Sequence, residues 1–270
     1  MAFRFGGAAL LALLFLILFT ALPFAFSALW LRRRRLADLY LRPLPPIESL
    51  KTSLRRAAEM GEAVHLSPGT GTLHQRGSAG ETLAGLEVLR GVAKEAMSLG
   101  VPVRATCNDA LVNVAVEKAL AEALKTIGNP PGLEPKNLLV AQHDPVAYAA
   151  GVVDTLSQPD LQGNVLMGAA GEELLLIGEV GTRETTFQVL GAARPAAASL
   201  LPLLTKDFLL GEEIYAAAAY LDPKPNRLMS LLTQDGVRMV LLVLIALGVI
   251  LATVGILDRS LGLLFRMPMP

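Results

Sequence analysis

Residues 63–106, AVHLSPGTGTLHQRGSAGETLAGLEVLRGVAKEAMSLGVPVRAT, decide the fold of this chain. Two short apolar segments, Ala63–Leu66 and Val101–Thr106, flank a segment with apolar residues at the 3.6-residue spacing of a helix packed on a sheet. Ser78, with Glu81 three residues later, predicts a capping box at the start of that helix. A strand, a crossover helix and a second strand form the unit from which parallel sheets are built.

The same alternation continues to about residue 221. Periodicity leaves residues 196–204 open between a strand and a buried helix. Strands that alternate with helices predict an α/β fold, a Rossmann-like three-layer domain with a mainly parallel sheet, whose strand order stays open. Further strands are predicted at 137–142, 164–168 and 185–190, and further helices at 47–60, 109–127, 145–156, 172–179 and 207–221.

Two apolar stretches flank this domain, from about Gly7 to Leu31 and from Met239 to Leu257. Each reaches the roughly 20 residues that cross a membrane, which predicts one N-terminal and one C-terminal transmembrane helix. The first is predicted to be an uncleaved signal anchor, because its apolar run is long and its positive charges follow it. The positive charges are those of Arg32, Arg33, Arg34 and Arg35. They predict that the segment after them stays in the cytoplasm.

The predicted organisation is an N-terminal transmembrane anchor at 1–35, a cytoplasmic α/β domain at 36–236, and a C-terminal transmembrane helix with a short tail at 237–270. The protein would cross the cell (inner) membrane twice, with both termini outside. The 24 Lys and Arg residues equal the 24 Asp and Glu residues, which argues against nucleic-acid binding. The expected partners of the arginines are the anionic lipids of the inner leaflet.

Two loops that follow predicted strands are the candidate ligand-binding sites, because ligands bind at that edge of an α/β sheet. Their glycines would let backbone N–H groups approach a phosphate. The P-loop lysine and the full G-x-G-x-x-G spacing are missing, however, so ordinary turn chemistry is the favoured interpretation. The candidate ligand-binding residues are Ser67, Gly69, Thr70, Gly71, Gly168 and Gly171.

No catalytic residue, metal site or cofactor is predicted. His65, His74 and His143 lack the spacing of metal ligands. Cys107 precedes a helix whose N-terminus could lower the thiol pKa, with His65 as a base, but a small buried residue is the favoured interpretation. Asn108 or Asp109 is predicted to cap that helix, and a cap is favoured over a catalytic acid for Asp109. Acids at helix starts and on solvated faces are commoner than acid–base clusters. A helix-start or surface role, and not acid–base catalysis, is therefore the favoured interpretation for Glu172, Glu173, Glu179, Glu184, Glu212 and Glu213.

Four segments carry a resemblance to a known family: HLSPGTGTL from His65, ETLAGLEVLRGVAKEA from Glu81, GAAGEELLLIGEVG from Gly168 and LLGEEIYAAAAYL from Leu209. They resemble an uncharacterised family of two-span membrane proteins of anaerobic bacteria and archaea, with a cytoplasmic α/β domain of unknown function. The resemblance covers nearly the whole chain. It implies an anchor, an α/β domain and a second anchor, and it implies no activity.

The predicted function is a non-catalytic, membrane-anchored scaffold that self-associates, because two anchors occur without a constellation of catalytic residues. Gly248 and Ala252 form a pair of small residues that membrane helices use for packing. The expected partners are further copies of the chain and a membrane or cytoplasmic protein. The alternative is a membrane-anchored sensor or enzyme that binds a small ligand at the strand-end loops. A multi-subunit pore is the last choice, because neither span has an internal charge.

Overall fold

The computed structural model describes residues 42–75, 77–140 and 144–253, together with Ala21 and Ala25. The chain divides into an α/β unit, Arg42–Pro223, and a second unit that contains helix α10, Pro225–Thr253. Apart from Ala21 and Ala25, the predicted N-terminal span lies outside the described residues, and so do the four arginines that follow it.

The α/β unit is built on one six-stranded sheet, in which each neighbouring pair of strands is parallel. The strand order is β3-β2-β1-β4-β5-β6, so the winding direction reverses between β1 and β4. The predicted parallel α/β sheet is therefore confirmed. The strands are β1 Ala63–Gly69, β2 Val103–Cys107, β3 Lys136–Leu139, β4 Leu161–Ala169, β5 Phe187–Ala192 and β6 Asp207–Leu210.

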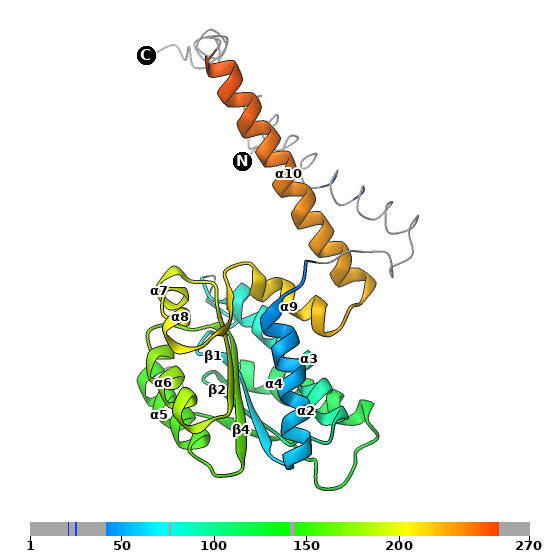
Figure 1. Cartoon of the computed structure of the whole chain (residues 1–270), viewed down its shortest axis with the longest axis vertical. Helices are drawn as coiled ribbons and strands as arrows, with labels where there is room; N and C mark the ends of the chain where they lie inside the picture. Colours follow the sequence, from blue (N-terminus) through cyan, green and yellow to red (C-terminus); the bar gives the residue numbers. More distant parts are fainter. Residues whose placement is uncertain (1–20, 22–24, 26–41, 76, 141–143, 254–270) are drawn as a thin grey trace, which may run out of the picture. The chain divides into compact units, whose positions relative to one another are not determined.

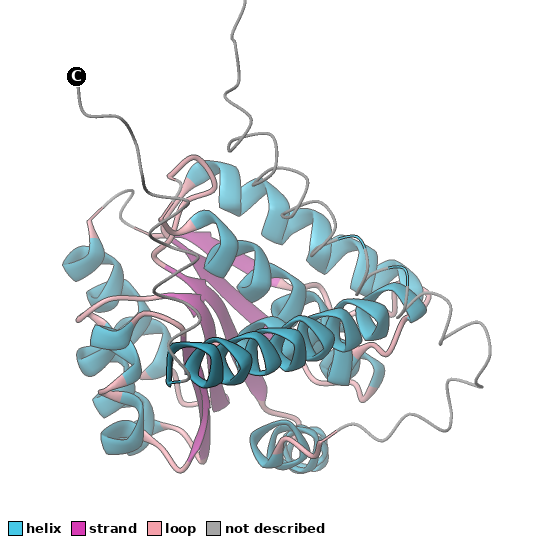
Figure 2. Cartoon of the chain, turned by 90° about the horizontal axis from the view of Figure 1, so that it is seen from above, coloured by secondary structure: helices cyan, strands magenta, loops and turns pink. Residues whose placement is uncertain are grey.

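Helices cover both faces of this sheet (Figures 1 and 2). One apolar core lies between the sheet and α2, α3, α4 and α9, and a second lies between the sheet and α5 to α8. Because both faces are covered, the central strands β1 and β4 are buried along their whole length. The helices are α2 Pro45–Met60, α3 Ala79–Ser98, α4 Ala110–Thr126, α5 Pro145–Leu156, α6 Leu174–Glu184, α7 Pro195–Ala198, α8 Leu201–Leu204 and α9 Glu213–Leu221.

Two segments differ from the sequence-based prediction or resolve it. Residues 207–210 form the edge strand β6 and not the start of a helix, because they pair with β5. Gly211, with a φ of 57°, then separates this strand from α9. Residues 196–204 fall in two short helices, each with a proline in the first turn, where proline is tolerated.

The two predicted helix caps also differ in outcome. Of the two residues predicted to cap α4, Asp109 is the cap, since its carboxylate accepts a hydrogen bond from the Val112 amide at 3.0 Å. The capping box at α3 is wrong, because the Ser78 side chain makes no cap bond there. Its hydroxyl donates to the Thr72 carbonyl oxygen, and Glu81 pairs with Arg194. Thr72 and Arg194 thus replace the backbone amides of the first helical turn, which the capping box would have used as partners.

Helix α10 contains a segment, Ser230–Ile250, that is long and apolar enough to cross a membrane. Within the described part of the chain it is the one such helix, and none of the segment is buried. It overlaps the predicted C-terminal span, so membrane association is indicated by its length and composition.

Candidate functional site

The reversal of winding brings the two predicted loops together at the carboxyl edge of the sheet. Gly69 pairs with Ala169, and the Thr70 amide donates to the Ala169 carbonyl oxygen at 2.8 Å. Ligands of doubly wound sheets bind in the crevice outside the strand ends at this reversal. The loop after β1 and the loop after β4 therefore occupy the position where this fold holds its ligands.

The glycines of these loops allow the two strands to approach each other closely. A Cβ atom on Gly69 would lie 2.1 Å from the Ala169 carbonyl oxygen, and one on Gly168 would lie 2.3 Å from the Pro68 carbonyl oxygen. The φ angles of Gly69 and Gly168, 85° and 142°, also favour glycine. This packing accounts for both glycines without any approach of backbone N–H groups to a phosphate.

A cavity of about 260 Å³, which we call the switch-point cavity, opens beside these loops. Of the predicted ligand-binding residues, Thr70 and Gly71 line it, whereas Ser67, Gly69 and Gly168 lie within β1 and β4. The lining is mainly polar and comes from loops that follow β1, β2, β3 and β5. It consists of Thr70, Gly71, Thr72, Gln75, Ser78, Asn108, Pro145 and Arg194.

Two buried residues of the cavity each have a side-chain oxygen without a hydrogen-bond partner among the described residues. Asn108 is 3% exposed and Thr72 is 6% exposed. Within the described residues, neither Asn108 Oδ1 nor Thr72 Oγ1 has a partner. An unsatisfied buried polar atom costs about 1–3 kcal/mol. A bound molecule with a hydroxyl or amine donor would remove this cost, so the cavity favours a polar ligand.

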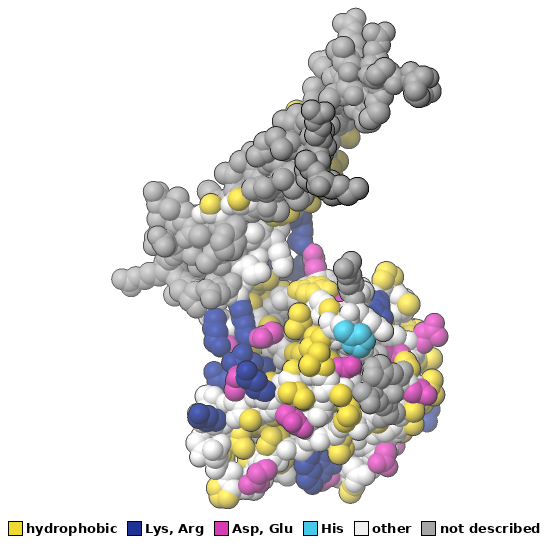
Figure 3. All heavy atoms as spheres, turned by 180° about the vertical axis from the view of Figure 1, so that it is seen from behind, with side chains coloured by type: hydrophobic (Ala, Val, Ile, Leu, Met, Phe, Trp, Pro, Cys, Tyr) yellow, Lys and Arg dark blue, Asp and Glu magenta, His cyan; other side chains and the backbone are white. Residues whose placement is uncertain are grey.

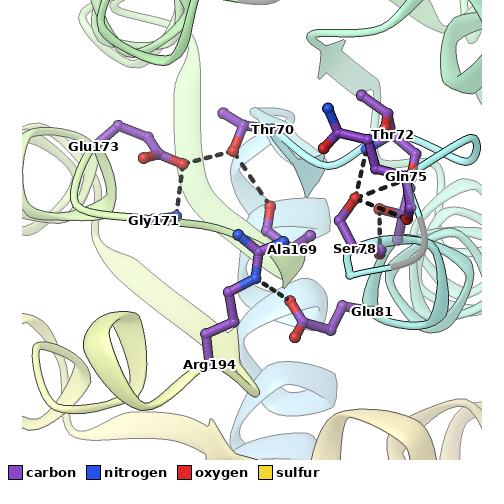
Figure 4. A network of polar contacts seen from close by, with 10 residues as sticks. Thr70, Thr72, Gln75, Ser78, Glu81, Ala169, Gly171, Glu173 and Arg194 are labelled. Atoms are coloured by element: carbon purple, nitrogen blue, oxygen red, sulfur yellow. Dashed lines mark hydrogen bonds and ion pairs between the residues drawn. The ribbon is translucent and has the colours of Figure 1, made fainter.

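The cavity also contains a cation. Arg194 Nε lies 3.2 Å from Glu81 Oε2 (Figure 4). Burial raises the pKa of Glu81, and the neighbouring Arg194 opposes this shift. An arginine side chain carries five N–H donors, so pairing through Nε leaves donors for a second anion. The positive charge of Arg194 therefore favours an anionic group in the ligand.

Glu173 ties the two loops together. One carboxylate oxygen, Oε1, accepts hydrogen bonds from Thr70 Oγ1 at 2.6 Å and from the Gly171 amide at 2.7 Å (Figure 4). Glu179 pairs with Arg183 on α6 instead. Glu173 and Glu179 therefore have separate partners, and Glu173 has a structural role.

Beneath the cavity, polar side chains cross the sheet in a row. His65, Asn164 and Gln188 occupy paired positions of β1, β4 and β5. His65 Nδ1 lies 2.8 Å from Asn164 Oδ1, and Asn164 Nδ2 donates to Gln188 Oε1 at 2.8 Å. The Gln188 amide nitrogen in turn donates to the Gly178 carbonyl oxygen at 2.9 Å. Because a carbonyl only accepts, this last bond fixes the direction of the others, and His65 carries its proton on Nδ1.

The row continues from the other nitrogen of His65. Nε2 accepts from Thr106 Oγ1 at 2.8 Å, and Thr106 accepts from the Tyr148 hydroxyl at 3.0 Å. Tyr148 accepts from Ser67 Oγ at 2.5 Å, and Ser67 accepts from the Gly69 amide at 2.9 Å. This assignment of donors and acceptors is the one in which every hydrogen bond from Gln188 to Ser67 has one donor and one acceptor. We call the residues from Gln188 to Ser67 the buried chain.

Both ends of His65 are thus occupied, and it is not a base for Cys107. Burial lowers the pKa of His65 to about 4, so the imidazole is neutral at pH 7. Burial, together with Asp109 and Glu117, raises the pKa of Cys107 to about 12. Cys107 is buried and protonated, in agreement with the favoured interpretation, and its thiol donates to Asn113 Oδ1 at 3.1 Å.

Asn108 and Arg194 were not predicted from the sequence as cavity residues, and most of the buried chain was not predicted either. Asn108 directly follows β2, and Arg194 lies two residues after β5, so the strand-end criterion used for Ser67 applies to both. The sequence signal for the buried chain is the polar residues within apolar strands, which are His65 and Ser67 in β1, Thr106 in β2, Asn164 in β4 and Gln188 in β5. Among the described residues, no group of three or more His, Cys, Asp or Glu could hold a metal ion. His143 lies outside them.

A protein family described as a domain of unknown function (DUF6754) matches residues 4–261. No curated protein and no solved structure matches the chain.

Proposed function

Since the chain belongs to the DUF6754 family, which brings no activity with it, we propose a function from the switch-point cavity. The α/β unit binds a small hydroxylated anion there, and the protein acts as a membrane-anchored ligand sensor. The observation that carries this proposal is the pair of buried, unpartnered polar atoms, Asn108 Oδ1 and Thr72 Oγ1, in a cavity that also contains Arg194.

The class of ligand follows from these groups. Arg194 selects an anionic group, and Asn108 Oδ1 selects a hydroxyl or amine donor beside it. The Thr72 hydroxyl can donate to such a ligand or accept from it. The cavity volume of about 260 Å³ is below the roughly 300–1,000 Å³ of sites for drug-sized ligands. A hydroxy acid or a phosphorylated polyol fits this description better than a dinucleotide does.

Isothermal titration calorimetry on the full chain in lipid discs tests this function. Glycerol 3-phosphate and lactate serve as hydroxylated anions, while glycerol and orthophosphate each lack one of the two required groups. Arg194→Gln is expected to weaken binding at least about 10-fold, because an ionic hydrogen bond contributes about 1.5–3 kcal/mol. Arg183→Gln is the matched control, because Arg183 is an exposed residue of α6 outside the cavity.

Two results would contradict the proposal. One is equal affinity of the Arg194→Gln variant and the Arg183→Gln variant for the anions. The other is an absence of binding by every probe, combined with native mass spectrometry that shows no small molecule retained by the gently extracted protein.

For the membrane arrangement, we propose the two-pass topology with a cytoplasmic α/β unit and both termini outside. It is supported by the apolar segment Ser230–Ile250, by the apolar residues 7–31, and by the arginines at 32–35. These arginines would lie at the anionic headgroups of the inner leaflet.

Self-association into a scaffold is the second candidate function, with a second copy of this chain as the partner. β3 is an edge strand, so one side of it offers unpaired backbone groups to another strand. Its Leu138 and Leu139 are 48% and 45% exposed. Other hydrophobic side chains are also exposed on the surface of the α/β unit (Figure 3).

Native mass spectrometry of the full chain in detergent tests this scaffold. A defined oligomer that dissociates in the Leu139→Lys variant is expected, since a charge on an edge strand opposes pairing. Leu203→Lys is the control, because Leu203 is exposed but lies in α8, away from β3. A wild-type monomer would contradict self-association. An oligomer that survives Leu139→Lys would contradict the assignment to β3.

A further inference from the structure

A second cavity of about 570 Å³ opens at the opposite edge of the sheet. Residues at the starts of β4, β5 and β6 line it, together with residues of α2 and the last turn of α6. We call it the amino-end cavity. Its volume is within the range of sites that bind small molecules.

The charges of the amino-end cavity favour an anion. Arg56 and Lys206 both line it, and neither has an ion-pair partner within the described residues. The one acid of the lining, Asp207, accepts a hydrogen bond from the Ser49 hydroxyl at 2.6 Å. Partial negative charge also comes from the carboxyl end of α6, but it is about half an elementary charge against two full cations.

We propose that the amino-end cavity binds a multiply charged small anion of the class of phosphorylated compounds. This inference is independent of the function proposed for the switch-point cavity.

Pyrophosphate is the probe for the amino-end cavity, titrated calorimetrically into the full chain in lipid discs. Arg56→Gln and Lys206→Gln are each expected to weaken binding at least about 10-fold. Arg55→Gln is the matched control, because Arg55 is the adjacent exposed arginine of α2 and is not part of the lining. Arg194→Gln should leave this binding unchanged.

Absence of pyrophosphate binding would overturn the assignment of the site. An equal loss in the Arg55→Gln variant would also overturn it, because the effect would then be one of general surface charge.

Pyrophosphate binding without binding of any hydroxylated anion would show that the function proposed for the switch-point cavity is wrong, while the amino-end site stands.

Discussion

At the scale of the residue, His65 ties the stability of the fold to pH. The side chain is fully buried, and burial lowers its pKa to about 4, from about 6.5 in the unfolded chain. Between these two values the unfolded chain binds a proton that the folded protein excludes. The contribution of His65 to stability is therefore complete above pH 6.5 and decreases as the pH falls toward 4, by about 3 kcal/mol.

Chemical unfolding of the full chain, followed by circular dichroism at pH 7.5 and pH 4.5, measures this dependence. The slope of the unfolding free energy against pH reports how many more protons the unfolded chain binds than the folded protein. In the His65→Gln variant this number should be smaller by about one. An unchanged slope would show that other groups cause the pH dependence.

Gly181 offers a second test of the buried chain at this scale. A Cβ atom there would lie 1.8 Å from Gln188 Oε1, so Gly181→Ala must displace the carboxamide and break its bond to Asn164. We expect a loss of about 1–3 kcal/mol of unfolding free energy, measured by chemical unfolding. Gly77→Ala is the control, since no atom lies within 4 Å of its added Cβ. Equal stability of the two variants would argue against a tightly packed chain.

At the scale of the element, helix α4 depends on its cap. The Asp109 carboxylate accepts from the Val112 amide, so Asp109→Ala is expected to cost about 1 kcal/mol of unfolding free energy. Asp109→Asn should retain most of the stability, because asparagine is an equally good N-cap. If both variants lose the same amount in chemical unfolding, the charge of Asp109 matters and the cap geometry does not.

At the scale of the whole molecule, the two-pass topology makes a prediction about accessibility. In a Cys107→Ala background, a cysteine introduced by Ser260→Cys should react with an impermeant thiol reagent on intact cells. One introduced by Ser98→Cys, at an exposed position of α3, should react only after the membrane is permeabilised. Labelling in the opposite order would reverse the proposed orientation, and labelling of both on intact cells would exclude a cytoplasmic α/β unit.

The sequence by itself determined the features that depend on near neighbours along the chain. Apolar residues at a 3.6-residue spacing predicted α3, short apolar runs predicted β1 and β2, and their alternation predicted a parallel sheet. The Asp109 cap was predictable for the same reason, because its bond spans three residues. The apolar run within α10 likewise needs no partner to be recognised.

Only the tertiary structure decided which distant residues meet. The strand β6 exists because β5 supplies its hydrogen-bond partners, and local pattern alone favoured a helix at Asp207. His65 and Asn164 are 99 residues apart in the chain and lie 2.8 Å apart in the sheet. Strand order and register set such pairs, and they also place Asn108 and Arg194 around one cavity. A periodic pattern reports which face of an element is buried, whereas a site depends on which elements are neighbours.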